Sequence, residues 1–134
     1  MKALLRYGPA VLCMAVIFYL SHQTGDDLGA LLPFFQQVLP SLTSFDPGHF
    51  VAYFLLALTF VWALGRHALH PWGKALVVAL CLAYGVTDEF HQSFVPGRSP
   101  DLMDLRNDGI GALIAVLLIS LPPFSRRLRN RFLS

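Results

Sequence analysis

The third apolar run of this chain is too short to cross a bilayer by itself. It covers only residues 75–87, between Lys74 and Asp88. A helix of that length rises about 20 Å, whereas the hydrocarbon core of a bilayer is about 30 Å thick. A crossing helix must therefore continue through the polar sequence DEFHQSF. We predict that it brings three polar side chains to membrane depth: Asp88, Glu89 and Gln92.

Three further apolar runs indicate a helical membrane protein. The 134-residue chain is 55% apolar and only 13% charged, which is unusual for a soluble domain. The first run lacks a small-residue cleavage site behind it, so we interpret it as a retained helix rather than a signal peptide. The pattern predicts an all-α fold with one membrane domain, residues 1–134. We expect a bundle of four transmembrane helices at about residues 5–22, 48–65, 72–94 and 102–121.

The segment between the first and second runs contains three prolines and no Lys or Arg. Leu28, Leu31 and Phe35 are spaced as on one face of a helix, which favours a short helix along the membrane interface. Pro33 interrupts this pattern. An irregular apolar loop packed on the bundle is therefore an equal alternative.

The fourth run follows the turn sequence VPGRSPD, and Ser99 or Asp101 is the expected N-cap of its helix. Asp104, Asp108 and Gly111 recur at positions i, i+4 and i+7, so they share one stripe of that helix. A glycine on this stripe would let a neighbouring helix approach closely. The pattern predicts two carboxylates at a helix contact.

Basic residues indicate the orientation of the chain. Two Lys or Arg precede the first run and none follows it, two follow the second, two follow the third and four follow the fourth. This distribution predicts a multi-pass protein of the bacterial inner membrane with both termini in the cytoplasm. All eight acidic residues then fall on the outer side. The tail arginines can meet anionic lipid head groups, although a topology anchor is enough to explain them.

Ionisable groups at membrane depth are candidates for a functional site. The principal catalytic candidates are His49, Glu89, Gln92, Arg98 and Asp104, and the supporting candidates are Asp46, Tyr53, Asp88 and Asp108. His49 or Glu89 would act as the acid/base group, and the planar fork of Arg98 would hold an anionic group of the substrate. A hydrogen-bonded interface residue is the ordinary alternative for His49.

Several other classes of site are less well supported. The chain has no GxSxG, HExxH or P-loop sequence. Carboxylates with one His could bind Mg²⁺, Ca²⁺ or Zn²⁺, so the cofactor stays open and a divalent metal is the less favoured alternative. The net charge of +2 without a dense basic surface does not favour nucleic-acid binding. Cys13 and Cys81 lie inside apolar runs and are expected to pack there as apolar groups.

Three stretches of the sequence resemble the VanZ-like family of small bacterial membrane proteins. They are FYLSHQTG after the first run, Asp46 with His49, Phe50 and Tyr53 at the start of the second, and DEFHQSFVPGRSPDLMDL with Gly111. The resemblance covers most of the chain from residue 18 to about residue 111. Two positions depart from the family pattern. Pro47 stands where the family often has Lys, and Asp108 stands where it often has Asn, which adds a carboxylate to an acidic cluster.

The resemblance implies a multi-helix protein of the cell envelope, and it links founding members to tolerance of teicoplanin-type glycopeptides. It does not bring a settled reaction. An enzyme acting on a lipid-linked or phosphorylated envelope substrate is one hypothesis. A non-catalytic scaffold, or a protein that binds a lipid or partner, is another; there Arg98 would pair with Asp101 or Asp104, and His49 with Glu89. A small proton-coupled transporter is less favoured. Membrane lipids are the expected partners, and the oligomeric state is open.

Overall fold

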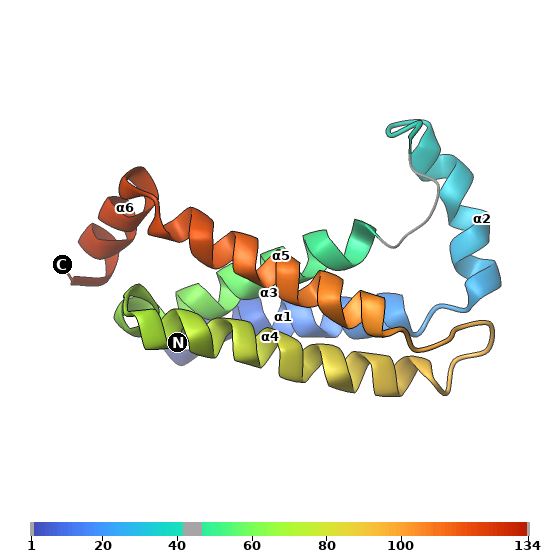
Figure 1. Ribbon diagram of the computed structural model, residues 1–134, viewed down its shortest axis with the longest axis horizontal. Coiled ribbons are helices and arrows are strands. Elements are labelled where there is room, and N and C mark those ends of the chain that lie inside the picture. The colour runs from blue at the N-terminus through green and yellow to red at the C-terminus, as the bar shows by residue number, and fades with distance from the viewer. Residues whose placement is uncertain (1, 42–46, 134) are drawn as a thin grey trace.

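The computed structural model describes residues 2–41 and 47–133, and within them every regular element is a helix (Figure 1). The prediction of an all-α chain is confirmed. The elements, in chain order, are α1 (Lys2–Ser21), α2 (Gly25–Gln36), α3 (Pro47–Leu64), the 3-10 helix η1 (Gly65–Leu69), α4 (Pro71–Gln92), α5 (Leu102–Ser120) and α6 (Pro122–Leu133).

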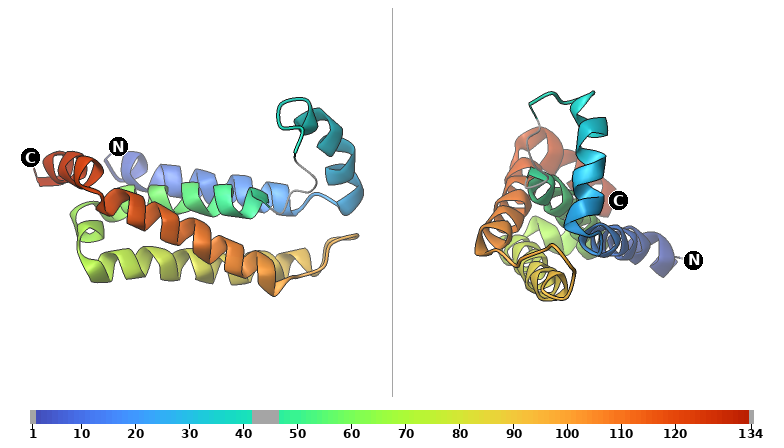
Figure 2. Two further views of the ribbon diagram at one scale, coloured as in Figure 1. Left: turned by 45° about the horizontal axis from the view of Figure 1, so that its top comes forward. Right: turned by 90° about the vertical axis from the view of Figure 1, so that its right-hand side faces the viewer.

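Four long helices, α1, α3, α4 and α5, lie side by side with α3 at the centre (Figures 1 and 2). The buried core between α3, α4 and α5 is mainly made of small and branched side chains, among them Leu56, Ala57, Val77, Ala112 and Val116. Large apolar side chains such as Leu12, Val51 and Leu113 point outwards and are exposed. An apolar outer surface of this kind suits a lipid environment.

Length and composition qualify two helical stretches as membrane spans, Leu4–Ser21 and Pro47–Leu69. Helices α5 and α6 together make a third if they are one broken span. Helix α4 does not meet these criteria, because its last turns carry Asp88, Glu89 and Gln92. The structure therefore supports two or three spans by these criteria in the described residues, rather than the expected four.

Helix α4 continues well past the end of its apolar run, as the sequence predicted. It starts with Pro71 in its first turn, where a missing N–H costs nothing, and it ends at Gln92. Gly97, with φ of 74°, then turns the chain towards α5. Asp101 is the N-cap of α5, because its side chain accepts a hydrogen bond from the Met103 backbone N–H. Of the two predicted caps, the structure uses Asp101.

The segment between α1 and α3 contains a helix, as one of the two alternatives predicted, and its placement along the membrane interface stays a prediction. Thr24 and Asp27 form a capping box at the start of α2, and Pro33 lies inside the helix. None of the described residues of α2 is buried, and the helix projects from one end of the bundle (Figure 1).

Close packing of α3 on α5 depends on Gly111. A Cβ at Gly111 would collide with the backbone carbonyl oxygen of Phe50 on α3. The predicted use of this glycine as a helix-contact residue agrees with the structure. Because Phe50 follows His49, this close contact also fixes where His49 lies relative to α5.

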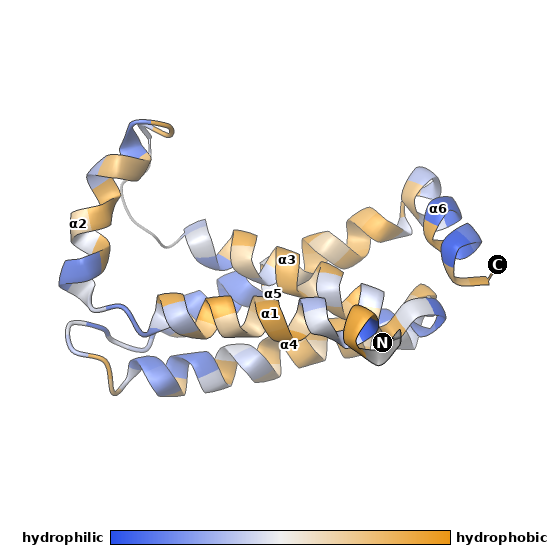
Figure 3. Cartoon of the chain, turned by 180° about the vertical axis from the view of Figure 1, so that it is seen from behind, coloured by the Kyte–Doolittle hydropathy of each residue, from blue (hydrophilic) through white to orange (hydrophobic). Residues whose placement is uncertain are grey.

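Helix α6 was not anticipated from the sequence. Pro122 and Pro123 end α5, yet both are accommodated in the first turn of the next helix. The axis of α6 is bent 80° from that of α5. Its basic side chains alternate with apolar ones (Figure 3), and Leu128 packs against the core. Helix α6 and the N-terminus lie at the same end of the bundle (Figure 1).

Candidate functional site

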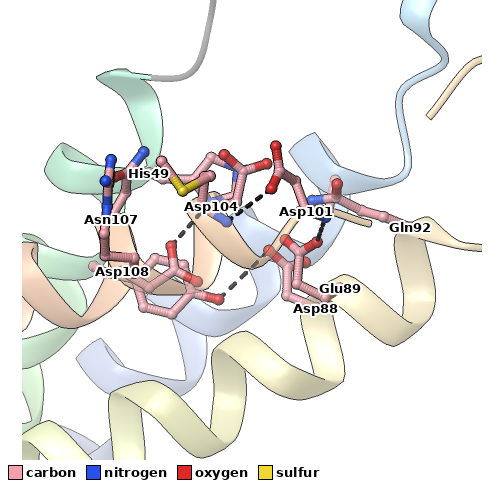
Figure 4. Close-up of polar contacts among 12 residues, drawn as sticks. His49, Asp88, Glu89, Gln92, Asp101, Asp104, Asn107 and Asp108 are labelled. Carbon is pink, nitrogen blue, oxygen red and sulfur yellow. Dashed lines mark hydrogen bonds and ion pairs between the residues drawn. The ribbon is translucent and has the colours of Figure 1, made fainter. Parts of the chain in front are cut away.

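His49 lies between two carboxylates of α5 (Figure 4). Its Nδ1 is 2.8 Å from Oδ1 of Asp108, and its Nε2 is 3.5 Å from Oδ2 of Asp104. The side chains of His49 and Asp104 are 14% and 17% exposed, whereas that of Asp108 is fully buried. The imidazole thus contacts Asp108 on its buried side and lies beside Asp104 at the surface.

Glu89 reaches the same place from α4. Its Oε2 accepts a hydrogen bond of 2.7 Å from the backbone N–H of Asp101, which fixes the side chain against the start of α5. Its Oε1 is buried and has no hydrogen-bond partner. One ligand-type atom from each of His49, Glu89 and Asp104 lies within 4.8 Å of the other two. Three helices therefore bring together the three ionisable groups that the sequence analysis placed in one site.

Two supporting candidates lie deeper between the helices. Asp88 is 4% exposed, and its Oδ2 accepts a long hydrogen bond of 3.4 Å from the hydroxyl of Tyr53. The ring of Tyr53 is also stacked on that of His49, with centroids 6.3 Å apart. Asp88 and Tyr53 therefore lie on the buried side of the site, next to His49.

Gln92 is buried near α1 rather than beside His49. Its side chain is 1% exposed, and its amide nitrogen lies 3.4 Å from the hydroxyl of Ser21. Its carbonyl oxygen is buried without a partner. The structure therefore gives Gln92 a place between α4 and α1, at the edge of the site.

Two of the candidates are not brought into this cluster. Arg98 is half-buried in the turn after α4, and its guanidinium makes no ion pair within the described residues. The expected pairing of Arg98 with Asp101 or Asp104 is absent within the described residues. Asp46 lies outside the described residues.

The hydrogen bond to Asp108 determines what His49 can do. If Nδ1 carries the proton and donates it to Asp108, Nε2 keeps its lone pair and faces Asp104 and Glu89. Such a nitrogen can accept a proton or bind a metal ion. No Lys or Arg of the described residues pairs with Asp88, Glu89 or Asp108.

The donor set also defines which metal ions would fit. His49, Glu89 and Asp104 would supply one nitrogen and two or more oxygens, which suits Zn²⁺ or Mn²⁺ better than Ca²⁺. Asp108 would then orient His49 from behind.

A small groove adjoins the cluster. Its volume is about 230 Å³, and its walls are mainly the apolar side chains of Val86, Pro100, Leu102 and Leu105. Glu89 and Asp101 supply its polar edge. An apolar groove that ends at a carboxylate fits an amphiphilic molecule better than a fully polar one.

The sequence analysis missed or undervalued part of this arrangement. Asp108 was a supporting candidate, yet it makes the shortest contact with His49. A stack of Phe18, His22 and His91 was not expected. Nδ1 of His22 lies 3.2 Å from Nε2 of His91. The only signal for that stack was the presence of His22 in FYLSHQTG and His91 in DEFHQSF, because their contact depends on how α1 packs on α4.

Comparison with known proteins identifies a family. The model of the family described as VanZ/LLP1 matches residues 8–123, a range that contains every site residue discussed above. No curated protein and no solved structure matches the chain.

Proposed function

The chain belongs to the VanZ/LLP1 family of membrane proteins, and from the geometry of its polar cluster we propose that it is an envelope enzyme acting on a lipid-linked or phosphorylated substrate. The observation that carries the proposal is the arrangement around His49. One nitrogen is held by buried Asp108, and the other faces Asp104 and Glu89 at the surface. This is how a general base is commonly oriented.

The proposed enzyme lies in the bacterial inner membrane with both termini in the cytoplasm. In this orientation α1, α3, α4 and α5 all cross, and the polar end of α4 is tolerated because it faces the bundle. The described basic residues of α6 and η1 lie at one end of the bundle, while the cluster around His49 lies at the other. The positive-inside rule supports placing the cluster at the outer surface.

In the proposed reaction, Nε2 of His49 takes a proton from a water molecule or a substrate hydroxyl, which becomes the nucleophile. Asp108 stabilises the imidazolium that forms. Glu89 returns a proton to the leaving group, and its buried, unpartnered Oε1 is the oxygen that can carry this proton. Arg98 lies in the neighbouring turn without a carboxylate partner in the described residues, so its side chain can swing to an anionic group of the substrate.

The apolar groove beside Glu89 supports a lipid-linked substrate. In the proposed complex, the first part of the lipid chain lies against Val86 and Leu105, and the polar head reaches His49. The substrate would then arrive within the membrane and react at its surface. A link to tolerance of teicoplanin-type glycopeptides is part of the proposal, because founding members of the family that the chain resembles are linked to it.

A structural network is the second candidate function. Asp108 joins α5 to α3, Tyr53 and Asp88 join α3 to α4, and Gln92 joins α4 to α1. These contacts link all four long helices, so the cluster would lock the bundle or hold a lipid or partner without catalysis.

Single substitutions at the exposed edge separate the two functions. Glu89→Gln and Asp104→Asn each remove one charge with almost no change in volume, and both side chains are only half-buried. If the cluster is a working site, both variants lose the tolerance of a teicoplanin-type glycopeptide that the wild-type protein gives to cells, while their unfolding in detergent stays near that of the wild type. A large drop in stability with each variant, or an unchanged phenotype, contradicts the enzyme.

Metal analysis decides which form of the chemistry applies. Direct acid–base catalysis predicts that the purified protein keeps its activity after chelation. Metal-assisted catalysis predicts about one Zn²⁺ or Mn²⁺ per chain, lost on chelation and in Glu89→Gln. Gln36→Glu, on the projecting helix α2, is a control that changes the charge by one unit away from the cluster.

A further inference from the structure

A second pocket lies at the opposite end of the bundle from the His49 cluster. Its volume is about 690 Å³, within the range of about 300–1,000 Å³ that is typical of small-molecule sites. It is lined by residues from the start of α1, the end of α3, η1 and the last turn of α6. Four basic side chains line it: Arg6, Arg66, His67 and Arg131.

The chain itself does not neutralise these groups. No acidic side chain of the described residues pairs with Arg6, Arg66 or Arg131. The acidic residues that the structure describes lie in α2, at the end of α4 and at the start of α5, at the other end of the molecule. The pocket therefore has a concentrated positive charge without a counter-ion from the protein, and an anionic ligand would relieve the repulsion.

Local contacts hold one guanidinium in place. Nε of Arg6 donates a hydrogen bond of 2.7 Å to the Ala63 carbonyl oxygen near the end of α3. Gly65 follows with φ of 57°, and a Cβ placed on it would lie 3.9 Å from Nη2 of Arg6. The side chain is thus anchored by one nitrogen and keeps its terminal nitrogens at the pocket wall. A guanidinium presented in this way suits a phosphate group.

Trp62 gives the pocket an amphipathic wall. Its indole Nε1 donates a hydrogen bond of 3.1 Å to the Leu5 carbonyl oxygen. Arg131 lies over its ring at 5.8 Å, and the ring of Phe132 is 5.8 Å away. Trp and Arg side chains in contact are typical of the level where lipid head groups meet acyl chains.

We propose that this pocket binds the phosphate group of an anionic lipid. Basic pockets between transmembrane helices are known to select such head groups, and here the arginines come from three separate elements, α1, η1 and α6. The free phosphate ion has the same chemistry and is the other possible source of the ligand. This binding site lies far from His49 and does not depend on the proposed reaction.

The test uses the full-length protein in a zwitterionic detergent, with the fluorescence of Trp62 as the signal and Trp72→Phe as the parent protein. Short-chain phosphatidylglycerol, short-chain phosphatidylcholine and inorganic phosphate are titrated in separate arms. We expect phosphatidylglycerol to bind and phosphatidylcholine not to. Arg66→Gln and Arg131→Gln should each weaken binding by about fivefold.

Arg129→Gln is the matched control. It removes the same charge from α6 at a residue that does not line the pocket. Its affinity should stay within about twofold of the parent, since the unit charge is removed outside the pocket. Arg6→Gln is not used because Arg6 also supports the end of α3.

Each result has a defined meaning. Saturable binding of phosphatidylglycerol alone, weakened in Arg66→Gln and Arg131→Gln, identifies a lipid head-group site. Saturable binding of inorganic phosphate with the same dependence identifies the free ion as the ligand. Equal binding of phosphatidylcholine and phosphatidylglycerol, or an equal loss in Arg129→Gln, overturns the proposal, because the pocket would then add nothing to general surface charge.

Discussion

The carboxylate of Asp108 is completely buried, and His49 is its hydrogen-bond partner. Its second oxygen has no partner and lies close to Gly85 of α4. Removing one member of a buried charged pair is costly, because the remaining charge has lost its solvent and its partner together. The stability of the site at the residue scale therefore depends on this pair.

His49→Ala should lower the free energy of unfolding by about 3–5 kcal/mol, because it leaves the Asp108 carboxylate buried alone. The double variant His49→Ala with Asp108→Asn should regain a large part of that loss, since a neutral amide is less costly to bury. Equilibrium unfolding in mixed detergent micelles measures both. Strictly additive losses in the double variant would show that the two side chains are not coupled.

Asp27 allows a pH test outside the membrane-spanning helices. Hydrogen bonds from the Thr24 hydroxyl and then from the Thr24 backbone N–H hold the pKa of Asp27 below its usual value. A carboxyl whose pKa is lowered by folding stabilises the cap above its unfolded pKa, and this contribution is lost as the pH falls through the lowered pKa.

Thr24→Val removes the hydroxyl and should raise the pKa of Asp27 towards its usual range. The start of α2 should then fray at a higher pH than in the wild type. An NMR titration of the Asp27 side-chain carbonyl gives the pKa, and amide exchange in α2 gives the fraying. An unchanged titration midpoint would show that the capping box does not form in solution.

Sequence spacing predicted which residue types meet in the site, but not how they pair. The short third run required Asp88 and Glu89 to lie at membrane depth, and the structure shows Asp88 buried and Glu89 half-buried. The choice of Asp108 over Glu89 as the partner of His49 depends on the rotation of α3 relative to α5. That rotation is set by packing between residues that are distant in sequence. Local sequence patterns contain no information about this packing.

Among the elements, α3 and α5 have the closest contact, and it passes through a glycine. Gly111 allows the backbone of α5 to approach Phe50, next to the first member of the site. Any side chain at this position must push the two helices apart, and this movement would separate His49 from Asp108. Helix packing and site geometry are therefore determined together.

Gly111→Ala should lower the free energy of unfolding by about 1–3 kcal/mol, the usual cost of overpacking. It should also weaken the glycopeptide phenotype, because His49 moves with α3. Gly29→Ala is the control, since a Cβ there meets nothing within 4 Å and the same substitution in an open helix is neutral or stabilises by up to about 1 kcal/mol. Equal stability of the two variants in detergent would contradict the close contact.

Prolines explain why the sequence left the structure of α2 open and why it did not predict α6. Pro33 was the reason to consider an irregular loop, yet the capping box of Thr24 and Asp27 starts α2 and Pro33 is accommodated within it. Pro122 and Pro123 follow the end of α5, and they also occupy the first turn of α6. Whether a proline ends one helix or begins the next depends on the residues after it. The residues after Pro123 include four arginines and show no clear apolar pattern, so the sequence did not predict a helix there.

Across the whole molecule, charge is divided between the two ends of the bundle. The described basic residues of η1 and α6 lie at the end that holds the N-terminus, and the acidic residues of α2, α4 and α5 lie at the opposite end. The order of charges along the sequence predicted this division, although it did not predict the 80° bend that turns α6 across the bundle.

Cysteine labelling in intact cells tests the proposed orientation. Ser99→Cys, in the turn between α4 and α5, should react with a membrane-impermeant maleimide, because four crossing helices place this turn outside. Arg129→Cys, on α6, should react only after the cells are permeabilised. Both side chains are exposed in the structure, and native Cys13 and Cys81 lie within the helices. Protection of Ser99→Cys in intact cells would show that α4 does not cross.

The bend between α5 and α6 has a consequence for bilayer thickness. In the proposed orientation α6 would lie along the inner surface, and Asp104 lies sixteen residues before the end of α5 at Ser120, which corresponds to about 24 Å along the helix. The hydrocarbon core of a bilayer is about 30 Å thick, so this carboxylate would lie a few ångströms inside the outer edge of the core in an ordinary membrane. A thinner bilayer would expose the Asp104 carboxylate to water, and a thicker bilayer would place it deeper in the hydrocarbon core. The choice of acyl-chain length alone should therefore tune how readily water reaches His49.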